Sequence, residues 1–99
     1  MKVVVCTPNC KPVTCDIENE LEAMQEIVGG YIEVVPLKNN YLIVCNEEGK
    51  LMGLEPNVRY YNEMIVGTFF VVAEDENDPS EFRGLTDEEA DFWESVFSI

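Results

Sequence analysis

The residues best suited to chemistry are four cysteines, three of which lie within ten positions of one another. They are Cys6, Cys10 and Cys15, and the fourth is Cys45 at the end of an apolar run. The sequence contains no histidine. Because four thiolates form a complete tetrahedral set for Zn²⁺, this pattern predicts a zinc site. Such a site has no open position for water, so we expect it to brace the fold rather than to catalyse a reaction.

The sequence leaves three other roles open for these thiols. Buried free cysteines behave as small apolar side chains, which suits Cys6 and Cys45 because each ends an apolar run. Disulfides are disfavoured in the bacterial cytoplasm, where we expect the protein because the sequence has no secretory signal and no apolar run of the roughly 20 residues that a membrane helix needs. A catalytic thiol needs an activating partner, usually histidine, and the sequence has none.

Signatures of catalysis are missing from the rest of the sequence. It contains no phosphate-binding loop, dinucleotide-binding motif or nucleophile elbow. The segment 75–82 resembles the start of a calcium-binding loop, but it lacks the glycine and the glutamate that complete one. We therefore expect a protein that is not an enzyme, with structural Zn²⁺ as its cofactor.

Acidic residues dominate the charge of the chain. Twenty acidic residues face six basic ones, which gives a formal net charge of −14 at pH 7. Such a field repels nucleic acid and anionic membranes, so we expect no contact with either, and it favours a basic protein partner. The carboxylates predicted to face this partner are Glu18, Glu22, Glu26, Glu74, Asp75, Glu76, Asp78, Asp87, Glu88 and Asp91.

The first three of these carboxylates are spaced by four residues, which predicts that they stack on one face of a helix. Four helical residues rise about 6 Å, a pitch not far from that of the phosphates in a nucleic-acid strand. No lysine is placed to neutralise them. The row therefore favours mimicry of nucleic acid, directed at a basic channel. A solvated helix face that only improves solubility is the alternative.

Apolar periodicity predicts the elements that must position these groups. Strands are predicted at 1–7, 13–17, 31–37, 41–45 and 65–74, and helices at 17–28 and 85–97. The strand at 65–74 is the most apolar and is expected at the centre of the sheet. Segment 51–54 could form a short strand, and 55–64 is expected to be irregular or to contain one helical turn. This order predicts a single α+β domain over residues 1–99, with a mostly antiparallel sheet and two helices.

Local signals mark the ends of both predicted helices. Asp16 is a plausible N-cap for the first helix, and Gly29 with Gly30 predicts its end. Thr86 and Glu89 have the spacing of a capping box at the start of the second. If the first strand lies beside the strand at 41–45, the four cysteines would converge at one end of the sheet, and zinc would brace the N-terminal turn.

Four stretches resemble a family of small domains of unknown function found in Firmicutes, their phages and conjugative elements. They are EIVGGYIEVVPL, CNEEGKLMGLEPN, IVGTFFVVAED and LTDEEADFW, and the resemblance extends over most of the chain. It implies an α+β domain carried on mobile elements, and it supplies no catalytic residues. The cluster of Cys6, Cys10 and Cys15 departs from the family pattern, which fits a zinc site gained in this branch.

A small acidic protein of a mobile element looks like an anti-CRISPR protein. By this class analogy we expect an inhibitor that binds Cas9, whose heteroduplex channel is strongly positive, and that impedes loading of the target DNA. The alternative is a housekeeping domain of a mobile element that binds a small ligand or another protein, with acidity serving only solubility. Its site would then be the segment 51–64, through Asn57, Arg59, Tyr60 and Tyr61.

Overall fold

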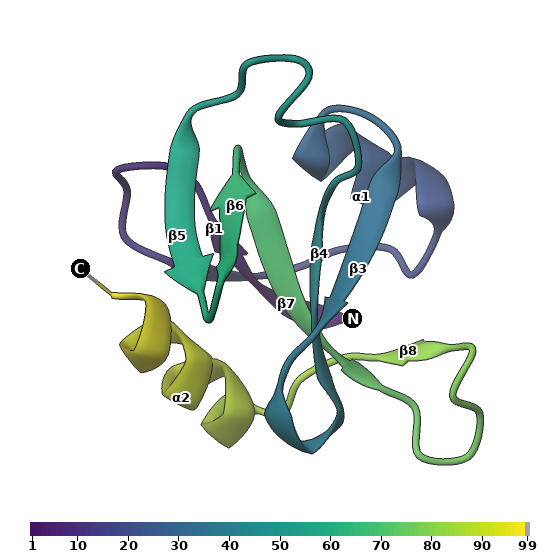
Figure 1. Cartoon of the computed structure of the whole chain (residues 1–99). Helices are drawn as coiled ribbons and strands as arrows, with labels where there is room; N and C mark the ends of the chain where they lie inside the picture. The colour runs from purple at the N-terminus through teal and green to yellow at the C-terminus, as the bar shows by residue number, and fades with distance from the viewer. Residues whose placement is uncertain (99) are drawn as a thin grey trace.

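An antiparallel sheet forms the centre of the computed structural model, which describes residues 1–98 (Figure 1). Its strand order is β2-β1-β7-β4-β3, and β8 pairs with the end of β7. A separate hairpin pairs β5 with β6. The strands are β1 (Lys2–Cys6), β2 (Val13–Asp16), β3 (Ile32–Pro36), β4 (Tyr41–Asn46), β5 (Pro56–Tyr60), β6 (Glu63–Val66), β7 (Phe69–Glu74) and β8 (Phe82–Arg83). The helices are α1 (Leu21–Val28) and α2 (Asp87–Phe97), with a 3-10 turn η1 (Lys38–Asn40) before β4.

Strand β7 occupies the centre of the sheet, which confirms the position expected from its apolar sequence. Its first five residues are fully buried, because it has a strand on each side and covered faces above and below. Val71 pairs with Val4 of β1 on one side and with Ile43 of β4 on the other. Strands β1 and β4 are therefore not adjacent, which was the condition for the four cysteines to converge: β7 lies between them.

Each face of the sheet is covered by one helix, and Figure 1 shows the two helices on either side of it. Met24 of α1 packs into a core with Val3 and Phe70. On the opposite face, Trp93 of α2 packs into a core that also contains Ile65 of the β5–β6 hairpin. This arrangement confirms an α+β domain with two helices on an antiparallel sheet. Within residues 1–98, neither helix is long and apolar enough to span a membrane.

Several predicted boundaries differ from the structure. Helix α1 begins at Leu21 instead of residue 17, because the N–H of Ile17 donates to the carbonyl of Met1 at 2.9 Å and prolongs the β1–β2 pairing. Asp16 is therefore the last residue of β2 and not a helix cap. Segment 51–54 forms turns, and segment 55–64 contains β5 and the start of β6. Strand β8 was not expected.

The start of α2 has the predicted capping box, and Glu89 of this box also belongs to a larger hydrogen-bond network. The Thr86 side chain accepts from the N–H of Glu89, while the Glu89 carboxylate accepts from the N–H of Thr86 at 2.8 Å. The same carboxylate accepts two hydrogen bonds from Arg83 of β8, at 2.9 and 3.1 Å, and one from the hydroxyl of Tyr41. One carboxylate thus joins α2 to β8 and β4.

This network makes the stability of the fold depend on pH. Hydrogen bonds from Arg83, then from Tyr41 and the Thr86 N–H, lower the pKa of Glu89 from 4.5 to about 2, although partial burial opposes the shift. A carboxyl group whose pKa is lowered on folding stabilises the folded protein. The stabilisation is complete at pH values above the pKa of that group in the unfolded chain. That stabilisation is lost as the pH falls from about 4.5 towards 2.

We predict that Glu89→Gln lowers the free energy of unfolding at pH 7 by about 2 kcal/mol, because it removes a charge-assisted pair with Arg83. The neighbouring Glu88, which is exposed, provides the control, and Glu88→Gln should change stability by less than about 0.5 kcal/mol. Urea unfolding at pH 7 and pH 3 measures both. If the wild type and Glu89→Gln lose the same free energy of unfolding between pH 7 and pH 3, the role of Glu89 in the pH dependence is contradicted.

Candidate functional site

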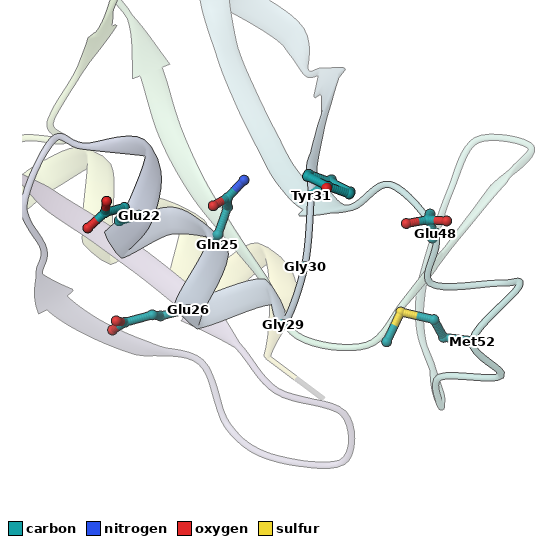
Figure 2. A pocket seen from close by; sticks show the side chains of 8 residues that line it. All are labelled: Glu22, Gln25, Glu26, Gly29, Gly30, Tyr31, Glu48 and Met52. Atoms are coloured by element: carbon teal, nitrogen blue, oxygen red, sulfur yellow. The ribbon is translucent and has the colours of Figure 1, made fainter.

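An open groove of about 540 Å³ lies between helix α1 and the loop that follows β4. Figure 2 shows side chains of α1 on one side, those of the loop on the other, and Tyr31 between them. The lining residues are Glu22, Gln25, Glu26, Gly29, Gly30, Tyr31, Glu48 and Met52. The groove therefore joins two segments that are about 20 residues apart in the sequence.

A tight turn at the end of α1 creates one side of the groove. Gly29 takes a left-handed conformation with φ of 81°, and its N–H donates to the carbonyl of Gln25 at 2.8 Å. This confirms the predicted helix end, since glycine adopts that conformation without a steric penalty. A Cβ atom on Gly30 would lie only 2.9 Å from the side-chain nitrogen of Asn46. Glycine at this position therefore allows the chain to pass close to β4.

The amide of Asn46 fixes the two sides of the groove relative to each other. Asn46 is buried, and its Nδ2 donates to the carbonyl of Val28 at 3.0 Å, at the end of α1. Its Oδ1 accepts from the N–H of Glu48 at 2.8 Å, in the loop. The N–H of Glu47 also donates to the carbonyl of Tyr31 at 2.8 Å. These bonds hold the helix end, β3 and the loop in one arrangement.

The lining of the groove combines negative charge with apolar surface. Glu22, Glu26 and Glu48 contribute three carboxylates, and no basic residue lines the groove. The side chains of Tyr31 and Met52 are 65% and 55% exposed. A cation attached to an apolar stem suits this lining, because the ring face attracts positive charge and the stem can cover apolar surface. Lysine and arginine side chains have that chemistry.

The predicted partner-facing acids do not share one surface. Glu22 and Glu26 line the groove, but Glu18 precedes α1, so the expected stack of three on one helix face is wrong. Glu74 ends β7, and the acids at 75, 76 and 78 follow it. They lie at the end of the sheet where β4 begins, whereas the groove lies where β4 ends. Asp87, Glu88 and Asp91 belong to α2, on the opposite face of the sheet.

Sequence reasoning missed half of the groove. Tyr31 is the first residue of the strand predicted at 31–37, Met52 belongs to the possible short strand at 51–54, and Glu48 was assigned no role in binding. The available signal was the pair Gly29 and Gly30 directly before an aromatic residue, which places an exposed ring at a sharp change of chain direction.

The four cysteines lie in three different environments. Cys6 pairs with Phe69, and Cys45 lies one residue beyond the pairing of Val44 with Phe70, so these two thiols flank β7 in the α2-side core. Cys15 pairs with Val3 and packs against the α1-side core, on the other face of the sheet. Cys10 is exposed in the turn between β1 and β2.

This arrangement does not bring four thiols around one metal ion. Within residues 1–98, no group of three or more cysteine or carboxylate side chains is arranged to hold a metal. A four-thiolate zinc site would need Cys15 to leave the face on which β2 places it. Zinc binding therefore stays a prediction, and it requires a different arrangement of β1 and β2.

Burial also changes the chemistry of the two inner thiols. It raises the pKa of Cys6 to about 12 and that of Cys45 to about 11, with a smaller contribution from nearby carboxylates. Both are therefore neutral at pH 7, and a neutral thiol is a poor nucleophile and a poor metal ligand. All four cysteines are free. In this structure Cys6 and Cys45 serve as small apolar side chains of the core.

The alternative site in segment 51–64 is occupied largely by structural contacts. Asn57 donates to the carbonyls of Cys6 at 2.9 Å and Gly67 at 2.8 Å, which ties the hairpin to the sheet. Tyr60 packs against the α2-side core. Arg59 and Tyr61 are exposed on the hairpin, and none of these four side chains lines the groove.

The fold and the groove define a small α+β domain with an acidic, partly apolar recess at one end of its sheet. The chain belongs to the family described as Domain of unknown function (DUF3846), and the match covers residues 1–98. This confirms the resemblance to a family of small domains of unknown function. No curated protein and no solved structure matched the chain.

We predict that Asn46→Ala lowers the free energy of unfolding by about 2 kcal/mol or more, because it leaves the Val28 carbonyl and the Glu48 N–H without their partner. It should also shift the NMR signals of Tyr31, since the loop and the helix end lose their shared contact. Asn77→Ala, in the exposed loop after β7, is the matched control and should have little effect. Equal stability of the two variants would contradict the role of Asn46.

The four thiols should differ in their reactivity with a thiol reagent. We expect Cys10 to react first in the native protein and Cys15 more slowly, with Cys6 and Cys45 reacting only after unfolding. Absorbance on reaction with a disulfide reagent measures this, and Cys10→Ser should remove the fast phase. If all four thiols are protected and the protein carries one equivalent of zinc, the four-thiolate site is established and this arrangement of β1 and β2 is wrong.

Proposed function

We propose that this protein is a binding domain that receives a positively charged segment of another protein in its groove. The observation that carries the proposal is that acidic residues of α1 and of the loop after β4 line one groove together with an exposed aromatic ring. Glu22 and Glu26 come from the helix, Glu48 comes from the loop, and Tyr31 lies between them.

The energetics of this groove favour a cationic side chain. A lysine or arginine stem can lie against Tyr31 and Met52 while its charged group approaches the carboxylates. Each exposed ion pair contributes only up to about 1 kcal/mol, so affinity depends on several contacts made together. The net charge of −14 adds long-range attraction, which accelerates association with a basic surface and weakens as salt is added.

Cas9 is the particular partner that we propose. An acidic domain that occupied part of its positive channel would impede the loading of target DNA, and the family resemblance to proteins of mobile elements favours such a target. The support is the acidity of the chain, the groove and that resemblance. In this role the protein acts as an inhibitor without catalysis.

The test measures binding of target DNA by guide-loaded Cas9 in the presence of the protein, at low and at high salt. We predict that Glu22→Gln combined with Glu26→Gln weakens inhibition about ten-fold, because two carboxylates on one side of the groove are lost. Glu76→Gln combined with Glu88→Gln removes the same charge away from the groove, and it should weaken inhibition less than about three-fold.

The outcomes separate three explanations. Selective loss of inhibition in the groove variant supports the groove as the binding site. Equal loss in both variants would mean that only the overall charge matters. If the wild-type protein leaves DNA binding by Cas9 unchanged, the inhibitor proposal fails.

A further inference from the structure

The free edge of β3 is a second feature that points to a peptide ligand. Strand β3 ends the strand order of the sheet, and among residues 1–98 no strand pairs with its outer side. An unpaired edge presents backbone N–H and C=O groups that can pair with another extended chain. The opposite edge, β2, differs because its Thr14 side chain is bonded to Glu94 of α2. No recess described above lies beside β2.

The pairing of β3 with β4 shows which backbone groups are free. The N–H of Glu47 donates to the carbonyl of Tyr31, and the N–H of Leu37 donates to the carbonyl of Tyr41, each at 2.8 Å. These bonds mark hydrogen-bonded pairs at both ends of the ladder. Because hydrogen-bonded and non-bonded pairs alternate along antiparallel strands, the N–H and C=O groups of Ile32 and Val34 point away from β4.

A recess lies beside this edge on each face of the sheet. The acidic groove begins at Tyr31, on the α1 side (Figure 2). A smaller recess of about 90 Å³ lies on the hairpin side, between β3 and β6. The buried side chain of Ile65 and the partly buried Val35 line it, together with Glu33, Glu63 and Lys50. The larger recess suits a long basic side chain, and the smaller one suits a side chain of the size of valine.

We propose that β3 accepts an extended basic segment of the partner as an added strand, whose alternate side chains enter the two recesses. Successive side chains of a strand point to opposite faces, so a segment that alternates lysine or arginine with valine would fill both. Charge complementarity selects this occupant, since carboxylates line both recesses and the net charge of −14 opposes pairing with a second copy of the chain. This inference deepens the proposed function and rests on it for the charge of the partner.

The test uses the full-length protein and an acetylated, amidated peptide of sequence Lys-Val-Arg-Val-Lys-Val, titrated by NMR. We expect the largest changes at the amides of Ile32 and Val34. Val34→Pro removes one outward N–H, but it leaves the bonds to β4 intact, because that N–H does not face β4. Its affinity for the peptide should fall about ten-fold or more. Val34→Ala keeps the N–H and shortens a side chain that is 40% exposed, so it should change affinity less than about three-fold.

Peptides with alternate N-methylation make the test independent of how well Val34→Pro folds. Methylation of the peptide amides that face β3 should abolish binding to the wild-type protein. Methylation of the peptide amides that face away from β3 should leave the affinity largely unchanged. Equal behaviour of the two peptides would overturn strand addition, as would the absence of binding to the wild type.

Failure of this inference can be told apart from failure of the proposed function. If the Glu22→Gln and Glu26→Gln pair weakens peptide binding while Val34→Pro behaves like Val34→Ala, the groove binds cations but β3 does not add a strand. If only Val34→Pro weakens binding, the peptide pairs with the outer edge of β3 and its binding does not depend on the carboxylates of the groove.

Discussion

The burial of β7 on both faces and along both edges is the constraint on which the rest of the structure depends. Its run from Phe69 to Ala73 is fully excluded from solvent, so it requires apolar cover on each side of the sheet and a paired strand at each edge. Helix α1 covers one face, while α2 and the hairpin cover the other. The same requirement places Cys6 and Cys45 on opposite sides of Phe69, which explains why these residues are apolar in character and buried.

The position of the groove follows from this packing. Helix α1 must lie on the sheet through Met24 and Val28, and it must then turn back at once to enter the edge strand β3. The turn exposes Tyr31 and leaves the outer carboxylates of α1 beside the loop after β4, where Asn46 holds both segments. The acidic groove and the free edge of β3 are therefore products of one chain reversal. Their closeness is the reason for proposing that a single extended ligand contacts both.

Sequence reasoning succeeded where the signal is local and failed where it is not. The capping box of Thr86 and Glu89, the helix end at Gly29 and the apolar run of β7 each depend on a few adjacent residues, and each was predicted. The start of α1 was missed because Ile17 fits a helical period by chance, while its N–H is in fact bonded to Met1. The separation of β1 from β4, and the presence of Glu48 in the same groove as Glu22 and Glu26, depend on which distant strands pair. No local pattern contains that information.

The position of β7 between β1 and β4 also has a kinetic consequence. Both neighbours are made before β7, and neither can pair on its inner side until the chain has been synthesised to about residue 74. The first two thirds of the chain must therefore leave the ribosome with two apolar strands unpaired along one edge. Folding of this domain waits for its last quarter, and it depends on contacts of long sequence separation, which form slowly. The ten acidic and five basic residues that precede position 74 give such incomplete molecules a net charge of only −5, because the other ten acidic residues come later in the chain.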